Sequence, residues 1–522
     1  MMTDKTLVLT GGTVHTLDPL RPRAGGLAVR DGRIAALDPQ PEDARHTIDL
    51  RGRAVLPGFI DAHLHFGAWA LAGQQVDLDP ADSLTEGLDL VRRAAERLAE
   101  PTSWLRGRGW DRNRWGRLPT AAELDAAVGS RPAVLSSRDG HSLWVNTPVL
   151  RLAEIGSATP DPPGGAIERD ARGEPSGVVF ENARDLVWRV VPPPSIDDLA
   201  SVIRAGLPVA AAAGLTGVHS FEDERSLEAF RRLDQAGELS LRVWHGAPRR
   251  QLRAARRLGL RTGVGSEHLQ IGPVKLFADG ALGSRTAYLL EPYARRADGY
   301  RGLPTLQPEE LLDDLQVAAD AGLDIAIHAI GDAAVRGVLD AVERSRAALG
   351  DRLVRIEHAQ LVDPADVPRF AALGVVASMQ PSHAVSDWRV ADAHWGGRAR
   401  HGYAWRTLLA AGACLAFGTD APVERIEPLP SLQAAVTRRD AEGQPPGGWY
   451  PEERLSLLDA VRAYTLGAAR AGRADHRRGS LSVGKDADLV VLSADPFAIE
   501  PDQLLEVRVE LTMVGGRIVY QG

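Results

Sequence analysis

The chain has 522 residues, of which 44% are apolar and 25% charged, a composition typical of a folded globular protein and not of a disordered one. Its net charge of −8 is spread without long runs, which argues against a nucleic-acid partner. The one cysteine, Cys414, excludes a disulfide within the chain and fits a reducing compartment. We see neither a signal peptide nor an apolar run long enough for a membrane span, so we expect a cytoplasmic protein without a membrane partner.

The first 56 residues are expected to form short β-strands. Runs of apolar and β-branched residues at 6–9, 26–29 and 33–37 are separated by glycine-containing turns, and Asp31-Gly32 is a strong hairpin signal. Similar runs of apolar and β-branched residues occur near the C-terminal end, at 487–492 and 511–520. We therefore expect residues 1–56 and 475–522 to form one small β-sandwich domain, and two unrelated flaps are the alternative.

The middle of the chain, residues 57–474, alternates short apolar runs with segments of helical periodicity, such as 309–321 and 333–349. This alternation predicts βα units and a parallel sheet. The eight strand candidates centre on Ile60, Val218, Val243, Lys275, Ile327, Ile356, Ala377 and Ala416. Eight such units predict an α/β fold, a (β/α)8 TIM barrel, whose active site lies at the C-terminal strand ends.

A large insertion follows the first barrel strand. Residues from about 67 to 205 are too many for one βα connection, so we interpret them as an inserted subdomain. This segment contains six of the eleven tryptophans, namely Trp69, Trp104, Trp110, Trp115, Trp144 and Trp188. They suggest an aromatic cover over the barrel mouth, and the alternative is that they pack in the core of the insertion itself.

Residue types that bind metals occur late in several of these strands. His63 and His65 are two residues apart, so in a strand they point to the same face and can reach one ion. Imidazole nitrogen suits zinc, although a His-x-His pair alone is a weak signal. Lys275, His328, His358 and Asp420 follow in order on later strands. Together these residue types indicate a two-metal hydrolytic centre.

The segments that carry these residues resemble those of a known family. They are Pro57-Gly58-Phe59-Ile60-Asp61-Ala62-His63-Leu64-His65, Lys275-Leu276-Phe277-Ala278-Asp279-Gly280-Ala281-Leu282-Gly283-Ser284-Arg285-Thr286, His328-Ala329-Ile330-Gly331-Asp332, Glu357-His358-Ala359-Gln360, Gly418-Thr419-Asp420-Ala421-Pro422, the C-terminal run 479–488, and 107–111 and 139–142 in the insertion. The chain is similar to the amidohydrolase superfamily, in particular the YtcJ-like branch that includes N-substituted formamide deformylases. The resemblance implies one or two Zn2+ ions, or other divalent metals, held by His63, His65, His328, His358 and Asp420. It also implies Lys275 as a bridging ligand.

Two of these residues need a chemical argument. Asp420 is expected to act as general base and then general acid toward water and the departing nitrogen, although an Asp after a strand is also a common helix N-cap. An ammonium group repels a metal, so Lys275 can ligate only after carboxylation, which burial favours by lowering its pKa. An unmodified Lys275 paired with Asp279 or with a substrate carboxylate is the alternative.

Four further residues are candidates for substrate binding: His141, His219, His383 and Arg285. A structural histidine is an equally good interpretation of the first three. Arg285, like Asp279, follows Lys275 closely and is expected either to orient the ligands or to bind substrate.

These observations predict a metal-dependent amidohydrolase that cleaves a non-peptide carbon–nitrogen bond of a small-molecule amide, an N-substituted amide or formamide. A deaminase of a cyclic amidine and a non-catalytic binding or scaffold protein are the alternatives. A homodimer is one possible assembly. The exact substrate is beyond the sequence, because fold does not determine function.

Overall fold

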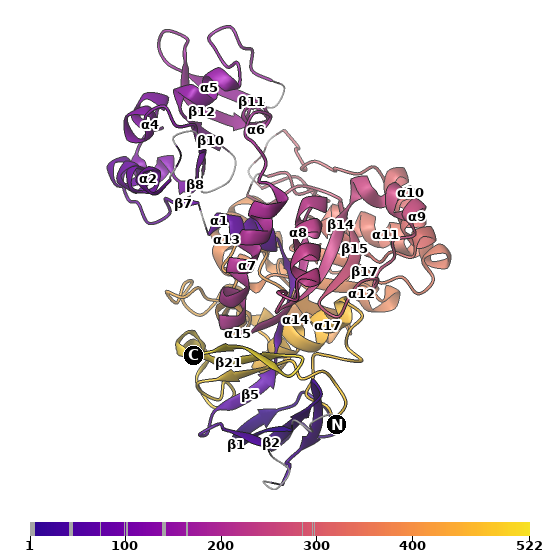
Figure 1. Ribbon diagram of the computed structural model, residues 1–522. Helices are drawn as coiled ribbons and strands as arrows, with labels where there is room; N and C mark the ends of the chain where they lie inside the picture. Colours follow the sequence, from indigo (N-terminus) through magenta and orange to yellow (C-terminus); the bar gives the residue numbers. More distant parts are fainter. Residues whose placement is uncertain are drawn as a thin grey trace. The chain divides into compact units, whose positions relative to one another are not determined.

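The computed structural model describes residues 6–40, 45–73, 75–98, 100, 103–137, 142–162, 165–283, 285–294, 296 and 298–522 (Figure 1). The chain divides into two compact units. The first combines Met1–Gly67 with Leu199–Gly522, and the second is Ala68–Asp198. Within the described residues, no helix has both the length and the apolar character needed to cross a bilayer.

An eight-stranded parallel sheet forms the centre of the first unit. Its strands, in spatial order, are β6 (Phe59–Leu64), β13 (Leu215–Phe221), β14 (Arg242–Pro248), β15 (Leu269–Phe277), β16 (Ile325–Ala329), β17 (Val354–His358), β18 (Val376–Met379) and β19 (Cys414–Phe417). Every predicted strand centre lies in one of them, in the predicted order, so the barrel prediction is confirmed. These strands are buried on both faces, which is why they appear in the sequence as nearly continuous apolar runs.

The two edge strands of this sheet, β6 and β19, meet just beyond the end of β19. The Asp420 amide donates to the His63 carbonyl oxygen at 2.7 Å, and the His65 amide donates to Ala421 at 2.8 Å. The Thr419 hydroxyl also donates to the Asp61 carboxylate at 2.6 Å. The barrel therefore closes at the place where the first and last predicted ligands lie.

Helices alternate with the barrel strands, as expected for βα units (Figure 1). They are α1 (Phe66–Ala72), α7 (Ile196–Ala212), α8 (Glu224–Gln235), α9 (Leu252–Leu258), α10 (Pro308–Ala321), α11 (Asp332–Leu349), α12 (Val367–Leu373), α13 (Pro381–Trp395), α14 (Trp405–Ala410), α15 (Pro428–Thr437), α16 (Leu457–Arg462) and α17 (Ala468–Ala471). Both helices predicted from periodicity are present, as α10 and α11. Helix α10 ends at Gly322, whose φ of +73° suits glycine at a helix C-terminus.

Both ends of the chain contribute to a second sheet. Its strands are β1 (Leu7–His15), β2 (Arg23–Arg30), β3 (Arg33–Leu37), β4 (His46–Asp49), β5 (Ala54–Pro57), β20 (Leu489–Leu492), β21 (Val509–Val514) and β22 (Arg517–Gln521). Strand β20 pairs antiparallel with β5, and Leu27, Val55 and Leu511 belong to one shared core. The prediction of one β-domain assembled from both termini is therefore confirmed, and two separate flaps are excluded. Asp31 and Gly32 form the predicted hairpin turn with φ values of 49° and 77°.

The second unit contains a six-stranded sheet and short helices. The strands are β7 (Val76–Asp77), β8 (Leu105–Trp110), β9 (Ala133–Ser137), β10 (Ser142–Val145), β11 (Gly165–Arg169) and β12 (Pro175–Glu181), and the helices are α2 (Leu84–Arg97), α3 (Arg112–Trp115), α4 (Ala121–Val128), α5 (Thr147–Leu152) and α6 (Arg184–Trp188).

The tryptophans of this unit pack largely inside it. Trp110 and Trp144 are fully buried, and Trp115 packs against both of them. Trp104 packs against a second core cluster of the same unit. For these four residues the alternative interpretation was right, because their rings supply the apolar core that a subdomain of this size needs.

Candidate metal centre

The predicted metal-binding residues lie at the C-terminal end of the barrel sheet. His63 is in β6, Lys275 in β15, His328 in β16 and His358 in β17, while His65 directly follows β6 and Asp420 is the third residue after β19. His65 and His328 are partly exposed, and the other four are buried. Two groups of three offer ligand atoms within 4.8 Å of one another: His63, His65 and Asp420, and His358, His383 and Asp420.

The histidine rings are oriented by hydrogen bonds from their Nδ1 atoms. His63 Nδ1 donates to Glu357 Oε2 at 2.6 Å, and His65 Nδ1 donates to the Phe221 carbonyl oxygen at 2.6 Å. His358 Nδ1 lies 2.9 Å from Gln380 Oε1. Because each Nδ1 has an oxygen acceptor, the lone pair that can bind a metal is on Nε2.

Distances around the Asp420 carboxylate distinguish metal-site geometry from ordinary hydrogen bonding. Its Oδ1 lies 3.4 Å from His65 Nε2 and 3.6 Å from His63 Nε2. A charge-assisted hydrogen bond is usually ~2.7–2.9 Å. Neighbouring ligands of a tetrahedral zinc ion, each ~2.0–2.1 Å from the metal, are ~3.3 Å apart. The donor set and its spacing therefore fit a divalent ion between His63, His65 and Asp420.

The protonation states also suit metal binding. Burial, together with the positive charge of Lys275, lowers the pKa of His63 to about 4 and that of His328 to about 3, so both are neutral imidazoles at neutral pH. Burial alone would raise the pKa of Asp420, but the contacts of its carboxylate with His383 and His65 hold that pKa well below its usual range. His63 and His328 are thus neutral imidazoles beside an ionised carboxylate, which are the forms that bind a metal. Burial lowers the pKa of His65, but its contact with the Asp420 carboxylate outweighs burial and raises that pKa above the usual value.

His328 has the opposite orientation. Its Nε2 lies 2.9 Å from the Gly280 carbonyl oxygen and 3.6 Å from Asp279, so its free nitrogen is Nδ1. Its ring centroid lies 4.6 Å from that of His358. Asp279 accepts backbone hydrogen bonds from Tyr288, Ile330 and Gly331. It therefore holds the loop beside His328, the orienting role considered in the sequence analysis.

Lys275 is buried at the same end of the barrel. Its Nζ lies 4.9 Å from the ring centroid of Phe221 and 5.1 Å from that of Phe277. Among the described residues, Nζ has no hydrogen bond or ion pair, and burial lowers its pKa to about 8. In the part of the chain that the structure describes, Lys275 has no ion pair with Asp279, which is one form of the alternative; pairing with a substrate carboxylate stays open.

Three non-glycine residues at this site have left-handed backbone conformations. The φ angles are +73° for His358, +42° for Ala359 and +60° for Asp420. Such conformations are uncommon for residues with a Cβ, and they concentrate at functional sites where the surrounding structure enforces them.

Comparisons with known proteins agree with this geometry. A model described as the amidohydrolase family matches residues 46–520. The chain belongs to this family. This amidohydrolase is 33% identical to the Bacillus subtilis protein YtcJ, with 98% of each chain covered. It is 30% identical to an N-substituted formamide deformylase of Arthrobacter pascens, with 99% of this chain and 98% of the relative covered.

A solved structure gives the same result for the fold and the class of enzyme. An uncharacterized metal-dependent hydrolase from Pyrococcus furiosus superimposes with a TM-score of 0.81 and is 29% identical. The match covers 94% of this amidohydrolase and all of that chain. The predicted membership of the amidohydrolase superfamily and of its YtcJ-like branch is thereby confirmed, as is the hydrolase class in its general form.

The four predicted substrate-binding residues of this amidohydrolase occupy different places. His383, in α13, lies beside Asp420, with 3.2 Å between Nε2 and Oδ2. Arg285 is exposed and donates to His394, and among the described residues it contacts none of the candidate ligands. His141 lies outside the described residues. A role in substrate binding stays a prediction for all four residues.

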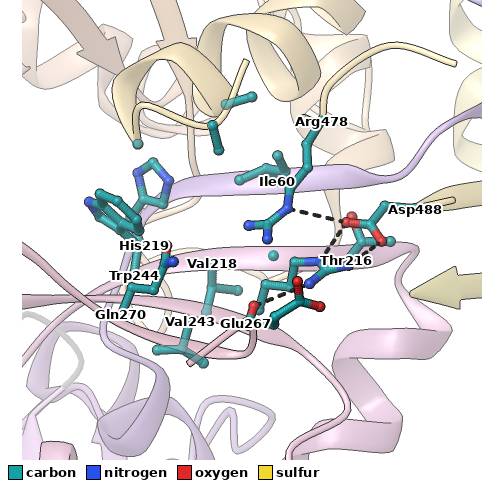
Figure 2. Close-up of a pocket in the computed structure, with 15 residues that line it drawn as sticks. Ile60, Thr216, Val218, His219, Val243, Trp244, Glu267, Gln270, Arg478 and Asp488 are labelled. Atoms are coloured by element: carbon teal, nitrogen blue, oxygen red, sulfur yellow. Dashed lines mark hydrogen bonds and ion pairs between the residues drawn. The ribbon is translucent and has the colours of Figure 1, made fainter. Parts of the chain in front are cut away.

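His219 lies deeper in the barrel. Arg355 donates to its Nδ1 at 2.7 Å and contacts Glu357 through other nitrogens. The ring lies beside Trp244 and lines a cavity of about 30 Å³. Arg478 and Asp488 also line this cavity (Figure 2). This cavity lies toward the N-terminal strand ends, because Asp488 pairs with Arg242, the first residue of β14.

Sequence reasoning missed the residues that support the ligands. Each of these residues contacts the Nδ1 atom of one histidine. Glu357 contacts His63, Gln380 contacts His358 and Glu424 contacts His383. A signal for Glu357 was present, since Arg355 and Glu357 are two apart in an otherwise apolar strand and so share one face. No comparable pattern marks Gln380 or Glu424.

Proposed function

We propose that this amidohydrolase cleaves a non-peptide carbon–nitrogen bond of a small-molecule substrate, an N-substituted amide or formamide. The main observation concerns the buried, ionised carboxylate of Asp420. The Nε2 atoms of His63, His65 and His383 lie 3.2–3.6 Å from its oxygens, close to the separation of two ligands on one zinc ion. The relative named as an N-substituted formamide deformylase supports the choice of bond.

The residues divide between two cation positions in this proposal. His63, His65 and Asp420 would hold one Zn2+, or another divalent ion, and His328 and His358 would contribute to a second. A divalent ion bound there would lower the pKa of a water molecule and polarise the substrate carbonyl. The protein's part is to hold the imidazole rings in place by hydrogen bonds, with the Nε2 atoms of His63 and His65 facing Asp420, and to enclose the site.

Asp420 is the proposed general base and acid. Its pKa is held below the usual range, so the carboxylate is ionised and can accept a proton from the attacking water. The same carboxylate would then pass the proton to the departing nitrogen, since an amine leaves an amide only when it is protonated. Its left-handed backbone holds it in this position beside β6.

Lys275 is proposed to be carboxylated. Its buried Nζ has no hydrogen-bonding partner among the described residues, and its lowered pKa leaves a larger fraction as free amine. Only the free amine reacts with carbon dioxide, and the carbamate supplies two oxygens that can ligate metals. The change also replaces a buried positive charge with a negative one, which suits a site for cations.

Polar groups without partners at the same end of the barrel support a polar small-molecule substrate. Gln360 and Gln380 follow β17 and β18, and the Gln360 Oε1 and Gln380 Nε2 atoms are buried without a hydrogen bond among the described residues. Buried polar atoms are rarely left unpaired, so a substrate group or an ordered water is expected to complete them.

The test is an activity screen of the zinc-loaded protein on N-substituted formamides, N-acyl amines, lactams and cyclic amidines. Release of a carboxylic acid together with an amine would support the proposal. Release of ammonia from a cyclic amidine would show a deaminase instead. No turnover by a protein that binds zinc stoichiometrically would favour a non-catalytic binding protein.

A further inference from the structure

We propose that His383 is a metal ligand and not a substrate contact, and that Asp420 bridges two cations through its two oxygens. In this arrangement Oδ1 joins His63 and His65 at one cation, and Oδ2 joins His358 and His383 at the other. The inference rests on the proposed function only in requiring that the centre binds divalent metal.

The two carboxylate oxygens face different histidines. Oδ1 lies 3.4 and 3.6 Å from the Nε2 atoms of His65 and His63, whereas Oδ2 lies 3.2 Å from His383 Nε2. All three distances are close to the ~3.3 Å that separates neighbouring ligands of a tetrahedral zinc ion. One carboxylate thus presents a ligand edge on each side, as a bridging ligand must.

His383 is supported in the same way as the predicted ligand His63. A carboxylate stands behind each ring: Glu357 Oε2 is 2.6 Å from His63 Nδ1, and Glu424 Oε1 is 3.3 Å from His383 Nδ1. The Ser386 hydroxyl donates to the same Glu424 oxygen at 2.5 Å and so helps to fix it. Carboxylates in this position orient histidine ligands and increase their basicity. This contact places the His383 Nε2 atom on the Asp420 side of the ring, 3.2 Å from Oδ2.

His358 provides the third group of this second set. Gln380 accepts from its Nδ1, so Nε2 is the nitrogen available to a metal. Its ring centroid lies 6.2 Å from that of His383, and the ligand atoms of His358, His383 and Asp420 lie within 4.8 Å of one another. All three residues are buried.

The chain position of His383 explains why its role is not visible in the sequence. It does not end an apolar strand, as the predicted ligands do, but is the third residue of α13, which begins at Pro381 directly after β18. The short connection brings the first turn of the helix to the C-terminal end of the barrel, where a helical residue can reach the same ions as strand residues.

The test is metal stoichiometry and affinity, measured by elemental analysis and by competition with a chelator. The wild-type chain is expected to bind two Zn2+ and His383→Ala one, with the tighter ion retained. Glu424→Gln should still bind two ions but weaken the second ~10–100-fold, as loss of a supporting carboxylate does. His394→Ala, on the same helix, is the matched control and should bind both ions normally.

A spectroscopic readout separates ligation from a structural effect. In the Co2+-substituted protein, His383→Ala should change the visible absorption of the second ion added and leave that of the first. Two ions bound by His383→Ala with unchanged affinity and spectrum would overturn the inference while leaving a metal-dependent hydrolase intact. Loss of the second ion in Lys275→Ala but not in His383→Ala would also overturn it and assign the bridge to the lysine. A wild-type chain that binds no metal would refute the proposed function itself.

Discussion

Glu357 and His63 are 294 residues apart in the sequence, yet Glu357 Oε2 accepts a hydrogen bond from His63 Nδ1 at 2.6 Å. Both side chains are fully buried. Arg355 donates to both oxygens of the same carboxylate and so compensates its charge. A buried ion pair inside the barrel therefore sets which nitrogen of a candidate metal ligand carries the proton, and the metal centre depends on groups that do not touch the metal.

This relationship predicts the behaviour of Glu357→Gln. The amide keeps the size of the side chain but removes its charge, so the His63 ring is oriented less firmly and is less basic. Zinc affinity should fall ~10–100-fold. Stability should also fall, because Arg355 then lies buried without its charged partner. A metal-buffer titration and thermal unfolding of the metal-free protein measure the two effects separately.

A matched control for Glu357→Gln is Glu453→Gln. Glu453 is also buried, but its carboxylate accepts from the backbone amide of Thr407 at 3.0 Å, away from the metal centre. This variant should keep the parent zinc affinity. If Glu357→Gln also keeps the zinc affinity of the wild-type chain, His63 needs no support from this carboxylate.

Metal removal should abolish activity. His63 and His65 face Asp420 at ligand spacing, and we expect the ion held there to be essential. Dialysis against a chelator should remove turnover, and added Zn2+ or Mn2+ should restore it. His65→Ala should bind less metal and should not recover fully. Full turnover by protein shown to be metal-free by elemental analysis is the outcome that contradicts the prediction.

Asp420→Asn tests the proposed proton acceptor. The amide is the same size but cannot take up a proton, so turnover at saturating zinc should fall by the ~10²–10⁴-fold typical of lost general acid–base catalysis. The Michaelis constant should change much less. Metal content must be measured in parallel, because Asp420 is also a candidate ligand. Near-normal turnover would contradict this role and assign the base to another group at the site.

The fold could be predicted because its signals are local. Each barrel strand is a short apolar run buried on both faces, and the order of strands and helices is sufficient for a (β/α)8 barrel. The residues at the strand ends could be predicted for the same reason, since a barrel brings its C-terminal ends together. His63, His65 and Asp420 are close in space because the segment after β19 hydrogen-bonds to β6.

The supporting residues could not be predicted because their role depends on packing between distant segments. Gln380 and Glu424 lie beside histidines only once β17, β18 and the loop after β19 have assembled. His219 shows the same dependence on packing. It is a histidine in a barrel strand, but Arg355 donates to its Nδ1, and its ring lines a cavity near the N-terminal strand ends (Figure 2). Spacing along one strand does not reveal the depth of a side chain in the barrel.

A buried ion pair between the barrel and the C-terminal segment predicts a stability effect. Arg242 donates to both oxygens of Asp488, at 2.7 and 3.0 Å, and both side chains are buried. Removing one charge, as in Asp488→Asn, leaves Arg242 only the more distant Asp486 carboxylate at 3.6 Å, and should cost up to ~3–5 kcal/mol. Denaturant unfolding of the metal-free protein measures this loss.

A double variant distinguishes this pair from general disruption of the core. Arg242→Leu combined with Asp488→Leu removes both charges together, so it should lose less stability than Asp488→Asn alone. An equal or larger loss in the double variant would mean that the hydrogen bond from Gly515 N to Asp488, at 2.7 Å, matters more than the ion pair.

Carboxylation of Lys275 is the remaining prediction. The amine is buried, its pKa is lowered to about 8, and the groups around it are candidate metal ligands. Lys275→Ala should therefore lose metal along with activity. A short carboxylic acid added in solution should restore part of the turnover, because its two oxygens can occupy the space of the carbamate. Intact-mass measurement under native conditions should show the added carbon dioxide in the wild-type chain and not in Lys275→Ala.

The controls for Lys275 separate a ligand from a buried charge. Lys275→Met fills the same space without charge and should lose metal as Lys275→Ala does, but a short carboxylic acid should not rescue it, because the methionine side chain leaves no room. Acid strips a carbamate, so the mass measurement is repeated after brief acidification, and the added mass should disappear. A crystal structure with a bare Lys275 amine and one fully occupied metal would contradict the prediction, and would favour a site built from histidines and Asp420 alone.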